Sequence, residues 1–164
     1  SYDPVNERRT LRGVTVAGPN CAGIIHLDPT WRFAATFLRD LPPGAEANGL
    51  AFISQSGALA EEFIDKANAR GLPLTSVVSV GNAVHLGVED YLAWLGERPE
   101  IGAALLYVES IEDHERFRSV ARMVTATKPV IGTACLSANL QCGYCETLTV
   151  TCKDNQWQVG GAPC

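Results

Sequence analysis

The middle of the chain, from residue 49 to about 134, alternates between two hydrophobic patterns. Short apolar runs predict buried strands at 50–54, 75–80, 103–109 and 129–134. Apolar residues three and four positions apart predict helices at 58–70, at 88–97 and from a capping-box-like Ser110 and Asp113 onward. Strands that alternate with helices in this way predict right-handed crossovers. The expected fold class is therefore α/β, a doubly wound parallel sheet with helices on both faces.

The two ends of the chain differ from this middle part. Residues 13–17 are expected to add a strand before a turn at 18–23, and residues 31–48 are interpreted as a loop-rich connection. After residue 132 helical periodicity disappears, and alternation at 146–152 followed by 156–159 predicts a β-hairpin. We therefore divide the chain into a connecting segment (1–48), an α/β domain (49–132) and a cysteine-rich tail (133–164).

Composition excludes several classes of protein. The 164 residues are 46% hydrophobic and 19% charged, which predicts a globular domain with its own core. A net charge of -5 argues against nucleic acid or an anionic membrane as partner, because both require a basic surface. No apolar run approaches the roughly 18 residues of a membrane span. We expect a cytoplasmic protein and, because the first residue is not Met, an excised part of a longer one.

The strongest chemical signal is a strand that runs directly into Ser54, Gln55, Ser56 and Gly57 and then into a helix. The first turn of a helix has unpaired amide donors, and the helix dipole adds partial positive charge there. These four residues are therefore candidate phosphate ligands, with Gly57 allowing close approach to the main chain. The alternative hypothesis is that Ser56 only caps the helix.

Two further candidates follow neighbouring strands. In an open parallel sheet, ligands bind beyond the carboxyl ends of the strands, where the strand order reverses. If the order is 2-1-3-4, counted from the strand at 50–54, then Gly81, Asn82 and Glu109 face the same crevice as Ser56. Glu109 would repel an anion unless it held a cationic partner such as histidine. The alternative for Glu109 is a helix-capping or solvent-facing acid.

Four segments carry a family resemblance, and they are Gly18-Pro-Asn-Cys-Ala-Gly23, Ile53-Ser-Gln-Ser-Gly-Ala-Leu59, Ser79-Val-Gly-Asn82 and Leu106-Tyr-Val-Glu109. Over residues 13–131 the chain resembles the nucleoside-diphosphate-forming acyl-CoA synthetases, which include the succinyl-CoA synthetase alpha subunit. The resemblance implies a flavodoxin-like ligase domain that follows the end of a CoA-binding domain. It also implies a ligase that makes an acyl phosphate, passes phosphate through a histidine to a nucleotide, and joins the acyl group to coenzyme A.

The resemblance assigns roles to individual residues. It implies that Ser56 and Gly57 hold the phosphate, that Glu109 is the catalytic partner of the phosphohistidine, and that Asn20 and Cys21 lie near coenzyme A. Coenzyme A and ADP or ATP are the implied cofactors, acyl-CoA and phosphate the implied small-molecule partners, and a homodimer is one assembly to consider. The family's histidine has no counterpart, because no histidine follows His114. Without that histidine and without the CoA-binding and ATP-grasp domains, the chain alone is expected to be inactive.

Other readings stay open at this point. One is a non-catalytic acyl-CoA-sensing or interaction module, similar to the ligase-like regions of some protein acetyltransferases. A serine hydrolase is disfavoured, because Ser56 lacks the Gly-x-Ser-x-Gly context. No metal is assigned, although Cys135, Cys142, Cys145 and Cys152 are spaced either for a zinc site or for disulfides. His26, His85 and His114 are expected at the surface or in loops.

Overall fold

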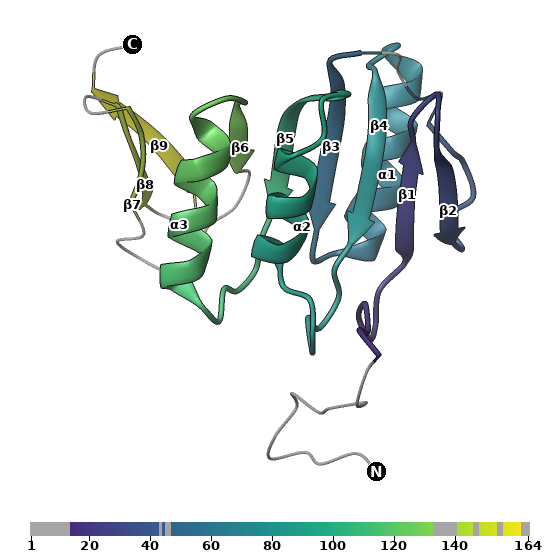
Figure 1. The fold of residues 1–164 in the computed structure, drawn as a ribbon, viewed down its shortest axis with the longest axis horizontal. Helices are drawn as coiled ribbons and strands as arrows, with labels where there is room; N and C mark the ends of the chain where they lie inside the picture. Colours follow the sequence, from purple (N-terminus) through teal and green to yellow (C-terminus); the bar gives the residue numbers. More distant parts are fainter. Residues whose placement is uncertain are drawn as a thin grey trace.

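The computed structural model describes residues 14–42, 44 and 47–132, and the backbone of 141–145, 148–153 and 156–161. A six-stranded sheet has the order β2-β1-β4-β3-β5-β6 (Figure 1). Its parallel part consists of β3 (Gly49–Ser54), β4 (Leu74–Ser79), β5 (Ile101–Tyr107) and β6 (Val130–Gly132). The predicted strand order is therefore confirmed, and the carboxyl ends of β3 and β5 lie side by side.

The rest of this sheet corrects the sequence analysis. Two antiparallel strands, β1 (Gly23–Leu27) and β2 (Arg32–Thr36), extend it beyond β4, so the sheet is mixed and not purely parallel. The strand expected at 13–17 is wrong, since residues 14–17 are not in a strand, and part of the expected loop at 31–48 is β2. Because His26 interrupts the apolar residues of β1 and because β2 is largely exposed at the edge, neither has the apolar run that identifies a buried strand.

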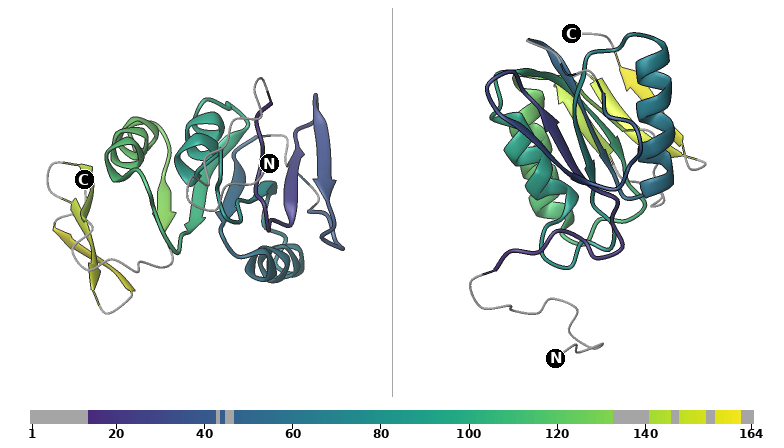
Figure 2. Two further views of the ribbon diagram at one scale, coloured as in Figure 1. Left: turned by 90° about the horizontal axis from the view of Figure 1, so that it is seen from below. Right: turned by 90° about the vertical axis from the view of Figure 1, so that its right-hand side faces the viewer.

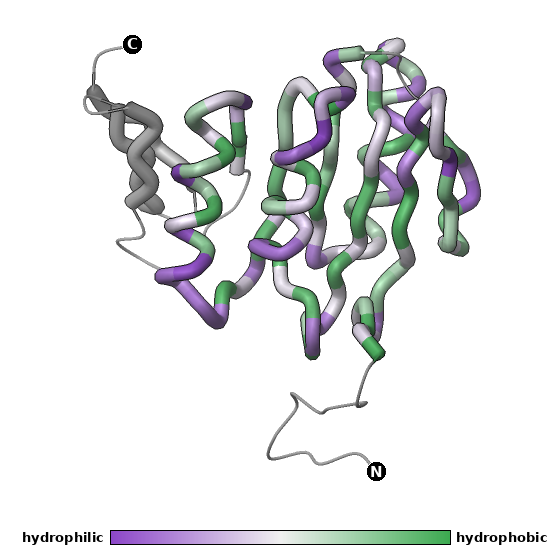
Figure 3. The backbone as a smooth tube through the Cα atoms, viewed as in Figure 1, coloured by the Kyte–Doolittle hydropathy of each residue, from purple (hydrophilic) through white to green (hydrophobic). Residues whose placement is uncertain are grey.

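Helices cover both faces of the sheet (Figure 2), and they are α1 (Gly57–Ala69), α2 (Val88–Gly96) and α3 (His114–Thr125). The period-two geometry of β3 divides the core between the faces. Phe52 packs with Ile64 of α1, whereas Ile53 packs on the other side with Leu92 of α2 and Phe117 of α3. Figure 3 shows the hydrophobic residues concentrated in the central strands, whereas the loop before α3 is hydrophilic. The expected three layers are present.

The third helix begins later than the sequence analysis expected. The Arg116 N–H donates to Oδ1 of Asp113 over 2.9 Å, which makes Asp113 the N-cap and His114 the first helical residue. The capping box expected at Ser110 is therefore wrong. Asp113 satisfies the amide donor itself, so residues 109–112 are left as a loop beyond β5.

His26 is buried in β1 and is not the surface histidine that the sequence suggested. Its side chain is 1% exposed and lies between the rings of Trp31 and Trp94, each at 5.2 Å. Nδ1 lies 2.6 Å from Oγ of Ser76, and Nε2 lies 3.2 Å from Oε1 of Glu100. Burial lowers the pKa of His26, and the nearby Glu100 carboxylate offsets only part of this effect.

The lowered pKa predicts a pH-dependent stability. Below about pH 6.5 the unfolded chain binds a proton at residue 26 more readily than the folded chain does. The free energy of unfolding should therefore fall as the pH decreases from about 7 to about 5, and His26→Gln should reduce this slope. Urea unfolding at several pH values measures this slope. His114→Gln is the control, because His114 is exposed. Equal slopes in the two variants would contradict this assignment.

The described part of the tail forms a separate antiparallel sheet of β7 (Gln141–Cys145), β8 (Leu148–Lys153) and β9 (Gln156–Gly161). Strands β8 and β9 pair with Lys153 opposite Gln156, close to the positions given by the alternating pattern. The sequence analysis gave no strand at β7. Cys135 and the side chains of Cys142, Cys145 and Cys152 lie outside what the structure describes, so zinc and disulfides stay predictions.

Candidate functional site

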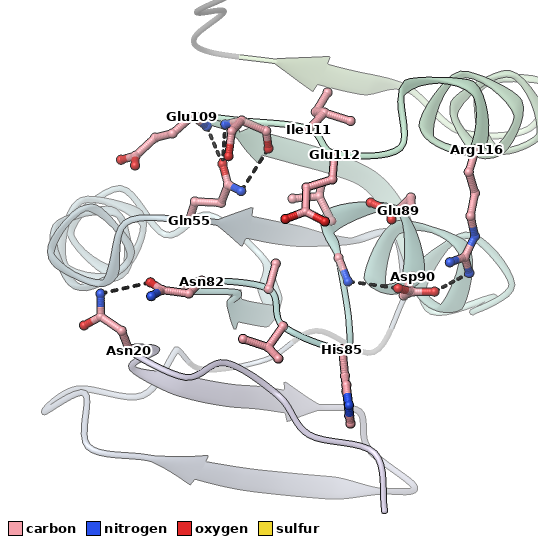
Figure 4. Close-up of a pocket in the computed structure, with 16 residues that line it drawn as sticks. Asn20, Gln55, Asn82, His85, Glu89, Asp90, Glu109, Ile111, Glu112 and Arg116 are labelled. Atoms are coloured by element: carbon pink, nitrogen blue, oxygen red, sulfur yellow. Dashed lines mark hydrogen bonds and ion pairs between the residues drawn. The ribbon is translucent and has the colours of Figure 1, made fainter. Parts of the chain in front are cut away.

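A pocket of about 460 Å³ opens beyond the carboxyl ends of the parallel strands (Figure 4). Its walls are the loops that follow β3, β4 and β5, the start of α2, and the turn before β1. Five of the nine candidate residues line it, and these are Asn20, Gln55, Gly81, Asn82 and Glu109. Residues from the three segments that were predicted to face one crevice therefore line this pocket, and Asn20 from the turn before β1 lines it with them.

Ser54 and Ser56 shape the turn between β3 and α1. Ser54 is fully buried, and its hydroxyl donates to the Ser56 carbonyl over 2.7 Å while accepting the Ser56 N–H over 3.1 Å. Oγ of Ser56 accepts the Leu59 N–H over 3.3 Å, so Ser56 is the N-cap of α1, as the alternative hypothesis held. Both hydroxyls are thus used in holding the main chain in place.

Two amide donors remain available at the start of α1. The Ala60 N–H donates to the Ser56 carbonyl over 3.1 Å, and the Leu59 N–H is capped. Within the part of the chain that the structure describes, no group accepts a hydrogen bond from the N–H of Gly57 or Ala58. Gly57 is half-buried and Ala58 is exposed, so a ligand can reach both. Together with the helix dipole, they form a binding position for an anion.

The turn before β1 is fixed against the loop after β4. The Asn82 N–H donates to the Pro19 carbonyl over 2.9 Å, and Nδ2 of Asn20 donates to Oδ1 of Asn82 over 3.2 Å. A Cβ at Gly57 would lie 3.2 Å from that of Ala22, so the same turn also contacts the start of α1. Cys21 is half-buried with Sγ 3.9 Å from the Ala17 carbonyl, and it is not in the pocket wall.

Glu109 lies on the opposite wall, held through its main chain by Gln55. Oε1 of Gln55 accepts the N–H of Glu109 and, over 2.8 Å, that of Ser110, while Nε2 donates to the Ser110 carbonyl over 3.0 Å. The side chain of Glu109 is exposed and points away from Glu112 and Asp90 (Figure 4). The predicted proximity of the phosphate turn and Glu109 is therefore present in the structure.

The remaining charged residues of the pocket were not predicted. Glu89, Asp90 and Glu112 join Glu109 in the wall, together with His85 and with Arg116, whose guanidinium contacts Asp90. The sequence feature that could have indicated them is the acidic pair Glu89 and Asp90 in the first turn of α2. In the structure, Oδ2 of Asp90 accepts the Gly87 N–H over 2.9 Å. The excess of carboxylates favours a cationic or hydrogen-bond-donating group in the pocket, next to the anion position at α1.

Among the residues that the structure describes, no group of three or more His, Cys, Asp or Glu side chains could hold a metal ion. No helix in this part of the chain has the length and apolar character needed to cross a membrane.

The fold and the site together define an α/β domain that presents a helix start at the switch point of its sheet. Comparison with known proteins identifies the family, because the family model for the succinyl-CoA ligase like flavodoxin domain matches residues 47–136. The chain therefore belongs to this family.

Its relatives are larger proteins. The chain is 38% identical over 119 residues to the alpha subunit of acetate–CoA ligase [ADP-forming] II from Pyrococcus furiosus, covering 73% of this chain and 25% of the relative. It is 36% identical over 119 residues to acetate–CoA ligase [ADP-forming] I from Archaeoglobus fulgidus, covering 73% of this chain and 17% of the relative. The chain thus spans at most about a quarter of the length of these two proteins.

Solved structures give the same picture. Dinucleotide forming acetyl-coenzyme A synthetase 1 from Ca. Korarchaeum cryptofilum is 33% identical with a TM-score of 0.66, covering 74% of this chain and 26% of that chain. A second structure of that protein is a complex with phosphate and ADP. The resemblance found in the sequence is confirmed.

Proposed function

We propose that this chain is the ligase domain of an ADP-forming acyl-CoA synthetase and that it receives a phosphoryl group at the start of α1. The observation that carries the proposal is the pair of unpartnered amides at Gly57 and Ala58, next to the turn that Gln55 ties to Glu109. Preorganised main-chain donors of this kind stabilise the charge of a phosphoryl group at little cost of reorganisation.

The two halves of the site suit a phosphorylated histidine. Its phosphoryl oxygens would accept hydrogen bonds from the amides of Gly57 and Ala58, and its ring N–H would donate to the Glu109 carboxylate. The acidic pocket wall favours the imidazole, whereas the helix start favours the phosphate. This complementarity supports Glu109 as the catalytic partner and Gly57 as a phosphate ligand, with Ser54 and Ser56 acting through the shape of the turn.

The complete reaction requires more than this domain. In the proposed scheme phosphate displaces the thiol of coenzyme A from an acyl-CoA to give an acyl phosphate. A histidine then takes the phosphoryl group and releases the carboxylate, and ADP accepts the phosphoryl group from the histidine to give ATP. No histidine follows His114 in this chain, so the phosphorylated residue would come from elsewhere in the intact protein. The CoA-binding and ATP-grasp domains would also come from there, and Asn20 and Cys21 would face the bound coenzyme A. The relatives are ligases, which does not favour the sensing-module alternative.

Replacing Ser56 with glutamate tests the phosphate position. The variant removes the capping hydroxyl and places a negative charge next to the Gly57 and Ala58 amides. We expect the affinity for inorganic phosphate to fall at least about tenfold, or 1.4 kcal/mol. A titration that follows the backbone amide resonances of residues 57 and 58 measures this change.

Ser56→Ala is the matched control, because it removes the cap without adding charge. It should lower stability by about 1 kcal/mol and keep most of the phosphate affinity. If phosphate shifts the two amide resonances as much in Ser56→Glu as in the unchanged chain, the anion is bound elsewhere and the proposal is wrong.

A further inference from the structure

Gln55 lies between the two serines of the phosphate turn, yet its side chain is turned toward the loop after β5. All three of its side-chain hydrogen bonds go to main-chain groups of Glu109 and Ser110. Its own N–H donates to the Tyr107 carbonyl over 3.0 Å, at the point where β3 and β5 are paired through Ser54 and Tyr107. One residue therefore joins the turn before α1 to the turn that carries Glu109.

The hydrogen-bonding capacity of the amide is largely used by these contacts. The oxygen has two lone pairs and accepts two N–H groups, and one of the two Nε2 hydrogens is donated to a carbonyl. The identity of the three partners also fixes which end of the amide is oxygen. At most one N–H of Gln55 is left for a ligand, which argues against its side chain as a principal phosphate ligand.

We infer that Gln55 is a positioning residue, which sets the Glu109 carboxylate at a fixed place relative to the Gly57 and Ala58 amides. The inference rests on the proposed function, because in that function the Glu109 carboxylate and the Gly57 and Ala58 amides bind the same phosphorylated histidine. It replaces the sequence-based assignment of Gln55 as a phosphate ligand. No other neutral side chain of this length can accept two hydrogen bonds at one end and donate at the other.

Two variants separate the parts of this role. Gln55→Ala removes all three side-chain bonds. Gln55→Glu keeps an oxygen that can accept the two N–H groups, but it cannot donate to the Ser110 carbonyl, and it adds a negative charge close to Glu109. Asn68→Ala is the control, since Nδ2 of Asn68 donates to the Leu41 carbonyl over 3.5 Å and lies outside the pocket wall.

The first measurement is amide hydrogen exchange at Glu109 and Ser110. We expect exchange about tenfold faster in Gln55→Ala, which corresponds to the loss of a hydrogen bond of ordinary strength, and near-unchanged exchange in Gln55→Glu and Asn68→Ala. The second is the recovery of slow exchange in Gln55→Glu, which keeps the oxygen that accepts the two N–H groups. A general loss of structure in the turn would not be restored by this variant.

A third measurement, titration with inorganic phosphate, distinguishes failure of this inference from failure of the proposed function. If phosphate does not shift the amide resonances of Gly57 and Ala58 in the unchanged chain, the proposed function fails whatever Gln55 does. If it does shift them, Gln55→Ala should retain most of the affinity. Unchanged exchange at Glu109 and Ser110 in Gln55→Ala would overturn the inference. So would a loss of phosphate affinity in Gln55→Ala as large as that in Ser56→Glu.

Discussion

Gly81→Ala should lower the free energy of unfolding by about 3 kcal/mol or more, the range for severe backbone conflicts. Gly81 has φ +63°, and a Cβ added there would lie 2.3 Å from the Pro19 carbonyl oxygen and 2.6 Å from that of Asn20. Both obstacles are main-chain atoms, so neither can rotate away. The Pro19 carbonyl is also the acceptor for the Asn82 N–H, and relief of the clash would separate the two loops that form this side of the pocket.

Gly71→Ala is the matched control for this prediction. Gly71 has nearly the same conformation, with φ +64°, but nothing lies within 4 Å of the position of an added Cβ. It should cost only about 1 kcal/mol, the penalty of a left-handed conformation for alanine. Urea denaturation of both variants measures the difference. Equal losses of stability would show that the contact between residues 19–20 and Gly81 is not held as closely as described.

Phe52→Ala should lower the free energy of unfolding by about 3–5 kcal/mol, as is typical of a large aromatic side chain removed from a core. Phe52 is 2% exposed and lies at the centre of β3, with its ring stacked on that of Phe63 at 4.3 Å. The cavity would open beneath α1, the helix whose first turn presents the amides of Gly57 and Ala58. Loss of phosphate affinity is therefore expected to accompany the loss of stability.

Phe37→Ala makes the same chemical change at a surface position. The Phe37 side chain is 80% exposed, so its removal should change stability by no more than about 0.5 kcal/mol. Thermal unfolding of the two variants under identical conditions compares them. A loss below about 2 kcal/mol in Phe52→Ala would contradict the packing of α1 on this face of the sheet.

The parallel core could be predicted from the sequence because its central strands, β3 and β4, are buried on both faces. Ile53, Val78 and Leu106 belong to apolar runs that stand out against the helical period of the segments between them. The two antiparallel strands, β1 and β2, could not be predicted in the same way. β2 is exposed along most of its length, and the side chains of His26 and Ser76 in the neighbouring strands bury polar groups that a hydrophobicity pattern assigns to the surface.

The candidate site could be predicted in part. The order 2-1-3-4 was a condition of the sequence analysis, and the structure has this order, which brings Gln55 and Glu109 together. Residue type alone could not show that Gln55 and Ser54 bond protein atoms, because side-chain direction depends on the loop conformation. The free N–H of Ala58 was missed for a related reason, since a main-chain donor leaves no trace in the identity of its residue.

The most direct test of the phosphate position is a crystal structure of the unchanged chain grown with inorganic phosphate. We expect a phosphate ion whose oxygens lie about 2.7–3.1 Å from the nitrogens of Gly57 and Ala58, on the side of the turn that faces Glu109. A structure in which protein atoms already accept hydrogen bonds from these two amides, with no space for an ion in front of them, would contradict it.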